Sequence, residues 1–155
     1  MKLVLPSDRE ILLTCVFDAP RRRVFEAWTR AEHVKRWYGP RGTTLLRCEI
    51  DFRQGGGYLY VLRADGDTAN TFRGTYHELV PPRRIIYTEV FETGGFTSSE
   101  SLVTLGFEEQ NGKTMLTSTS RYPSVEARDE VLKTGLEKGA AETLGRLADH
   151  LRTMS

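Results

Sequence analysis

The sequence predicts an α+β protein in which a curved antiparallel sheet of six to seven strands packs around one long C-terminal helix. Three observations lead to this fold class. Runs of β-branched and aromatic residues follow one another between residues 10 and 122, with turn residues between them. Two short helical patterns follow the first run, and a helical stripe occupies the chain after residue 123. The 155 residues form one domain, 1–155, with enough chain to bury its own core.

The first expected strand covers residues 10–17 (EILLTCVF) and ends at Asp18-Ala19-Pro20. Pro20 suits the first turn of a helix, because proline fixes φ near the helical value and its missing N–H is not needed there. Hydrophobic residues then recur at helical spacing, which predicts a short helix over 20–29. A second short helix over 31–37 is expected to end before Gly39-Pro40.

The middle of the chain predicts a series of strands joined by tight turns. The expected strands cover residues 45–52, 58–63, 71–80, 85–91, 102–108 and 113–122. Between them lie the turn signals Gly55-Gly56-Gly57, Asp65-Gly66-Asp67, Pro81-Pro82 and Asn111-Gly112. Short turns favour antiparallel pairing of successive strands, and a sheet of this width curls.

After Pro123 the hydrophobic residues adopt a helical period. Ser124 is a good N-cap, and one stripe then predicts a helix of about 27 residues over 124–151. Such a helix spans about 40 Å, long enough to cross one face of the sheet. Gly135 and Gly139 lie inside it at a cost to helix stability. They indicate either close contact between helix and sheet or room for a ligand.

Composition excludes several classes of protein. The formal net charge is +1, which argues against nucleic acid as a partner. No apolar run is long enough to span a membrane, and the apolar start is too short for a signal sequence. The two cysteines, Cys15 and Cys48, form no CxxC pair and fit a reducing compartment, although one bridge between them stays open. We therefore expect a cytoplasmic protein.

Several short motifs together resemble one known superfamily. They are Phe17-Asp18-Ala19-Pro20, Ala27-Trp28, Trp37 before Gly39-Pro40, Asp51-x-Arg53 before three glycines, Asp65-Gly66, Gly74-x-Tyr76 and Pro81-Pro82-x-Arg84. As a set they resemble the SRPBCC (START-like) superfamily. Within it the likeness is to bacterial homologues of the C-terminal domain of the activator of the ninety-kilodalton heat-shock chaperone ATPase, over about residues 9–151.

The resemblance implies a helix-grip fold with a cavity between the curved sheet and the long helix. Members of the superfamily bind lipids, sterols, polyketides or plant hormones in this cavity, and a few use it as an enzyme site. The eukaryotic activators carry a separate N-terminal domain that engages the chaperone, whereas only a short segment precedes the first expected strand here. Chaperone stimulation is therefore not expected to follow from the resemblance alone.

Few residues suggest catalysis. The sequence has no nucleophile elbow, no metal-binding motif and no phosphate loop, so we expect neither a metal nor a cofactor. His33, His77 and His150 are scattered, and lone histidines of this kind are usually exposed or satisfied locally.

Glu89 is the carboxylate that needs a closer look, because it shares a strand face with Tyr87 and Phe91. If this face points inward, burial raises the pKa of Glu89 and makes it an acid or a polar anchor for a ligand. The preferred interpretation is that Glu89 faces water or pairs with an arginine such as Arg73.

Aromatic residues indicate where a ligand would bind. Phe17, Phe25 and Trp28 are expected in the core, whereas tyrosines at alternate strand positions combine apolar rings with polar tips, as ligand pockets do. The predicted ligand-binding residues are Trp37 (at the rim), Phe52, Tyr60, Tyr76, Tyr87 and Leu136, with Glu89 or His77 as the polar anchor.

Three functional hypotheses follow. The preferred one is a non-enzymatic protein, monomer or homodimer, that binds a small apolar or amphipathic ligand, lipid- or polyketide-like, between sheet and helix. The second is a protein-interaction module, such as a chaperone co-factor of the stress response, that docks through a basic surface comprising Arg21, Arg22, Arg23, Arg30, Lys35, Arg36 and Arg41. The third is a weak cyclase or hydrolase that uses Glu89 or His77 as acid and base.

Overall fold

The computed structural model describes residues 1–64 and 69–154. The strands are β1 (Lys2–Val4), β2 (Glu10–Phe17), β3 (Thr43–Ile50), β4 (Gly57–Ala64), β5 (Ala69–Val80), β6 (Arg84–Thr93), β7 (Phe96–Thr97), β8 (Ser101–Gln110) and β9 (Lys113–Arg121). The helices are α1 (Arg21–Thr29), α2 (Ala31–Trp37), α3 (Val125–Leu132) and α4 (Leu136–Leu151). The expected turn at Asp65-Gly66-Asp67 lies outside the described residues.

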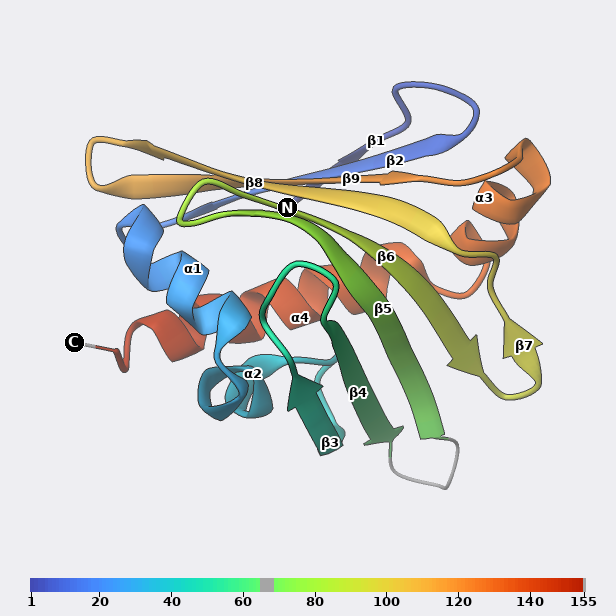
Figure 1. The fold of residues 1–155 in the computed structure, drawn as a ribbon, viewed down its shortest axis with the longest axis horizontal. Helices are drawn as coiled ribbons and strands as arrows, with labels where there is room; N and C mark the ends of the chain where they lie inside the picture. Colours follow the sequence, from blue (N-terminus) through green and yellow to red (C-terminus); the bar gives the residue numbers. More distant parts are fainter. Residues whose placement is uncertain (65–68, 155) are drawn as a thin grey trace.

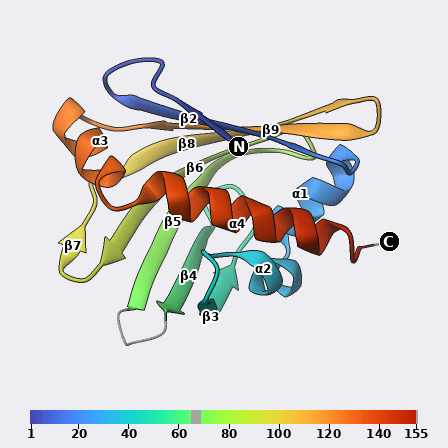
Figure 2. The ribbon, with the colours of Figure 1, turned by 180° about the vertical axis from the view of Figure 1, so that it is seen from behind.

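The predicted α+β helix-grip architecture is confirmed. In the described parts of the chain, nine strands form one antiparallel sheet in the order β1-β2-β9-β8-β6-β5-β4-β3, and β7 pairs with β6. The sheet curves, and α4 crosses its concave face (Figures 1 and 2). Helices α1 and α2 lie near the C-terminal end of α4, whereas α3 lies at its other end (Figure 2). The count exceeds the prediction because β1 and β7 are only three and two residues long.

The β8–β9 hairpin shows how local sequence determines a turn. Asn111 and Gly112 have φ values of 56° and 77°. These positive values are what a two-residue type I′ turn requires, and Asn-Gly adopts them at low cost. The hairpin predicted from this dipeptide is therefore confirmed, with Gln110 opposite Lys113.

The expected single helix over 124–151 is wrong, because the chain breaks it into α3 and α4. Ser124 caps α3 as predicted: its hydroxyl accepts a 3.1 Å hydrogen bond from the Ala127 N–H. Gly135 then takes φ 87° at the start of α4, a left-handed conformation that favours glycine. The break preserves the hydrophobic stripe on both sides, so the period of the sequence did not show it.

The core lies between the sheet and the helices. Trp37 is completely buried, and its indole Nε1–H donates a 3.0 Å hydrogen bond to the Ala27 carbonyl, joining α2 to α1. Phe17 and Phe25 are buried as predicted. A smaller cluster under α3 contains Ile11 and Tyr122. None of the described helices is both long enough and apolar enough to span a bilayer.

Candidate functional site

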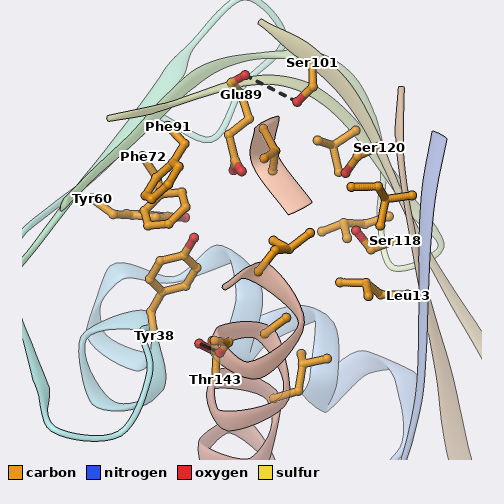
Figure 3. A pocket seen from close by; sticks show the side chains of 18 of the residues that line it. Leu13, Tyr38, Tyr60, Phe72, Glu89, Phe91, Ser101, Ser118, Ser120 and Thr143 are labelled. Carbon is orange, nitrogen blue, oxygen red and sulfur yellow. Dashed lines mark hydrogen bonds between the residues drawn. The ribbon is translucent and has the colours of Figure 1, made fainter. Parts of the chain in front are cut away.

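A cavity of about 290 Å³ lies between the concave face of the sheet and α4. Figure 3 shows its two walls, one from β4, β5 and β6 and the other from β2, β8 and β9, with α4 beneath. The walls are mainly apolar, and hydroxyl and carboxyl groups are spaced among them. Representative lining residues are Leu13, Tyr38, Tyr60, Phe72, Glu89, Phe91, Ser118, Ser120, Ala140 and Thr143.

Glu89 points its carboxylate into this cavity (Figure 3). It alternates along β6 with Tyr87 and Phe91, which also line the cavity. The Tyr58 hydroxyl donates a 2.8 Å hydrogen bond to Glu89 Oε2. Burial raises the pKa of the Glu89 carboxyl to about 7, while the hydrogen bond from Tyr58 acts in the opposite direction.

The preferred interpretation of Glu89 is therefore wrong. Arg73 pairs instead with Glu92, whose Oε1 lies 2.8 Å from Arg73 Nε. Arg73 and Glu92 lie on the outer face of the sheet, whereas Glu89 belongs to the inner face. Residues three apart on a strand point to opposite faces, which explains why Glu92 rather than Glu89 meets the arginine.

The structure brings five of the eight predicted site residues to the cavity: Tyr60, Tyr76, Tyr87, Leu136 and Glu89. Burial raises the pKa of Tyr60 and Tyr87 well above the ordinary tyrosine value, so both hydroxyls stay neutral. Their rings form part of a continuous aromatic wall. Within it the rings of Tyr58 and Tyr87 meet edge to face, with centroids 5.5 Å apart.

The other three predicted residues lie outside the cavity lining. Trp37 was expected at the rim, but its side chain is buried between the helices. Phe52 follows the end of β3 and packs edge to face on Phe25 and Tyr76, with centroids 5.9 Å and 5.2 Å away. His77 is exposed, because its neighbour Tyr76 occupies the inward position of β5.

Most of the lining residues were not predicted, and three of them are notable. Tyr38, directly after α2, turns its ring into the cavity, where its centroid lies 4.6 Å from that of the tilted Tyr60 ring (Figure 3). Trp28, expected in the core, also lines the cavity, and its Nε1 is buried without a hydrogen-bond partner in the described residues. The same holds for Asn70 Oδ1 on β5. The sequence signal for Tyr38 was its place in an aromatic pair just before Gly39-Pro40.

Two of the scattered histidines meet outside the cavity lining. His33 Nδ1 of α2 lies 2.9 Å from His150 Nε2 of α4. Burial lowers the pKa of His150, and the nearby His33 and Arg36 lower it further. The described residues include no cluster of three or more His, Cys, Asp or Glu side chains arranged to hold a metal.

The basic surface is partly neutralised by acidic neighbours. Arg41 lies 3.2 Å from an Asp149 carboxylate oxygen of α4, and Arg30 lies 3.7 Å from Glu26 one helical turn away. These exposed pairs contribute little to stability. They also reduce the positive charge that this surface offers to a partner.

Comparisons with known proteins agree with this geometry. A protein of Rhodobacter sphaeroides, known from its crystal structure, has 23% identity and a TM-score of 0.89, with 99% of each chain covered. A protein of Staphylococcus epidermidis has 28% identity and a TM-score of 0.81, covering 99% of this chain and 94% of its own. A protein of Chromobacterium violaceum has 26% identity and a TM-score of 0.80, covering 94% and 98%. No curated protein sequence matches.

The family evidence covers most of the chain. The sequence profile described as Activator of Hsp90 ATPase homolog 1-like protein matches residues 18–152. This range includes both short helices, the curved sheet from β3 to β9, and α4. The chain therefore belongs to the Activator of Hsp90 ATPase homolog 1-like family, within the SRPBCC superfamily of helix-grip proteins.

Proposed function

We propose that this protein binds a small apolar or amphipathic molecule in the cavity between the sheet and α4. The observation that carries the proposal is the cavity itself: about 290 Å³ of space between mainly apolar walls, with hydroxyl and carboxyl groups among the lining residues. Ligand pockets begin at about 300 Å³, and an apolar cavity of about 150 Å³ already binds benzene. The volume therefore suits a molecule of one or two rings, or a short chain.

The two alternative functions have weaker support. Arginines of the basic surface are partly paired with acidic residues of the same chain. This pairing lowers the positive electrostatic potential that the surface offers to a partner such as a chaperone. Of the two acid–base candidates His77 is exposed, and Glu89 lies in the cavity without a second Asp, Glu, His, Lys or Arg among the described lining residues.

Native mass spectrometry of the freshly purified protein, compared with its denatured mass, tests the proposal. We expect an adduct of a few hundred daltons that is lost on denaturation. Ser118→Phe places a ring in the cavity and should abolish the adduct, whereas Thr119→Phe, on the other face of β9, should retain it. An adduct that survives Ser118→Phe, or an adduct-free protein that also fails to bind tert-butylbenzene, contradicts the proposal.

A further inference from the structure

We propose that the cavity selects amphipathic cations, with an ammonium group held between the Glu89 carboxylate and the aromatic wall of Tyr38, Tyr60, Phe72 and Phe91. The inference rests on the proposed function and specifies the class of ligand. It arises from three features of the lining: its charge, its aromatic rings and a carboxylate oxygen of Glu89 that is free to accept a hydrogen bond.

The first feature is the charge of the lining. Among the described residues that line the cavity, Glu89 is the sole aspartate, glutamate, lysine, arginine or histidine. An anionic ligand would therefore meet a carboxylate with no basic side chain beside it. A buried charge is costly unless a partner of opposite sign accompanies it. An ammonium group supplies that partner, and Glu89 in turn supplies the counter-charge for the ligand.

The second feature is the aromatic wall. Phe72 and Phe91 stack with centroids 4.7 Å apart. Tyr38 meets Phe72 edge to face at 5.6 Å, and its ring is tilted against that of Tyr60 at 4.6 Å. Figure 3 shows these four rings on the side of the cavity toward which the Glu89 side chain descends. Aromatic faces attract cations within about 6 Å of the ring centroid, and aromatic cages bind quaternary ammonium groups by this means.

The third feature is a carboxylate oxygen that is left free for a ligand. Tyr58 donates to Glu89 Oε2, which leaves Oε1 for another donor. A protonated amine brings several N–H donors and no acceptor, so it matches this oxygen.

The described groups that face Glu89 do not themselves titrate near neutral pH. They are Tyr38 after α2, Tyr58 on β4, Tyr87 on β6 and Tyr122 after β9. Burial raises the pKa of each of them. Glu89 is therefore the group whose ionisation should govern binding of a permanently charged ligand.

Three probes of similar shape test the inference by NMR titration of the whole protein: phenyltrimethylammonium, its neutral isostere tert-butylbenzene, and the anion benzenesulfonate. We expect the cation to bind more tightly at pH 8 than at pH 6, because Glu89 ionises over this range. The neutral probe should bind equally or less tightly at pH 8, and benzenesulfonate should not bind at pH 8. These pH series use the wild-type chain and do not depend on a variant folding.

Variants then locate the effect. Glu89→Gln should lower the affinity for the cation at least tenfold and change the affinity for tert-butylbenzene less than threefold. Glu92→Gln, on the outer face of β6, should change neither affinity. Phe91→Leu should lower the affinity for the cation at least threefold. If tert-butylbenzene binds and the cation does not, or if the cation is indifferent to Glu89→Gln, the inference is overturned and the proposed function stands. If none of the three probes binds to the adduct-free protein, both are overturned.

Discussion

The hydroxyl of Tyr58 reaches Glu89 across an intervening strand, at 2.8 Å. Tyr58 belongs to β4 and Glu89 to β6, and β5 lies between them in the sheet. The residue opposite Tyr58 on β5 is Gly74, which has no side chain to block the phenol ring. The same hydroxyl lies 3.2 Å from the Thr88 carbonyl oxygen. The absence of a Cβ on one strand thus allows two strands beyond pairing distance to share a hydrogen bond.

Gly74→Ala should therefore be strongly destabilising. An added Cβ would lie 1.7 Å from the Thr88 carbonyl oxygen and 2.9 Å from Tyr58 Cε1, and backbone has to move to relieve this overlap. We expect a loss of about 3 kcal/mol in the free energy of unfolding, measured by urea denaturation. Gly106→Ala is the control, because its Cβ meets only the Thr117 side-chain oxygen at 2.7 Å. Equal costs for the two variants would disprove this explanation.

The raised pKa of Glu89 makes stability depend on pH. The Glu89 carboxyl ionises near the ordinary pKa of 4.5 in the unfolded chain and near 7 in the folded protein. Between these pH values the folded protein therefore keeps a proton that the unfolded chain has lost. The stabilising contribution is complete below 4.5 and is lost as the pH rises through 7. Relative to Glu89→Gln, the wild type should lose about 2–3 kcal/mol in unfolding free energy between pH 5 and pH 8.

Denaturation curves at several pH values measure this difference. Subtracting the unfolding free energy of the variant from that of the wild type cancels the contribution of His150. The lowered pKa of His150 changes stability with pH in the opposite direction. The control is Glu92→Gln, which removes an exposed partner of Arg73. Parallel pH curves for wild type and Glu89→Gln would show that the carboxyl is not buried as described.

The two tryptophans should respond differently to the same substitution. Trp37→Phe removes the Nε1–H that donates to the Ala27 carbonyl, whereas Trp28→Phe removes an Nε1–H without a described partner. The rings themselves meet edge to face, 4.8 Å apart. We expect Trp37→Phe to cost about 2–3 kcal/mol and Trp28→Phe about 1 kcal/mol or less, from thermal and urea unfolding. A larger cost at Trp28 would contradict the assignment of the indole hydrogen bond.

The glycines of the C-terminal region should give effects of opposite sign. Gly135 has φ 87°, so Gly135→Ala strains the connection between α3 and α4 and should cost about 1 kcal/mol. Gly139 is helical, and a Cβ there would lie 3.6 Å from Pro40 Cγ, which is ordinary contact. Gly139→Ala should raise stability by up to about 1 kcal/mol. Chemical denaturation measures the change in unfolding free energy for both variants. Changes of the same sign at Gly135 and Gly139 would contradict this prediction.

Much of the fold follows from local signals in the sequence. Asn111-Gly112 specifies its hairpin and Ser124 caps α3, because each acts on backbone atoms within a few residues. The division of the last helix depends on a backbone angle at Gly135. A hydrophobic period that continues on both sides of the break contains no information about that angle.

The site was less predictable because it depends on how the elements pack. The alternation that groups Glu89 with Tyr87 is visible in the sequence, but which strand face turns inward is a tertiary property. Similarly, the packing of α1 and α2 exposes Trp28 to the cavity and buries Trp37, the reverse of the prediction. His33 and His150 are 117 residues apart, so their contact had no local signal.

The most direct test of the central claim is to locate a bound probe in solution. Intermolecular nuclear Overhauser effects between tert-butylbenzene and the protein should come from both walls and the helix, for example from Leu13, Phe72 and Ala140, which line the cavity together. Such a set would show a molecule enclosed between sheet and α4. Contacts confined to exposed apolar side chains such as Val16, Leu46 and Met115 would contradict the claim that the cavity is the binding site.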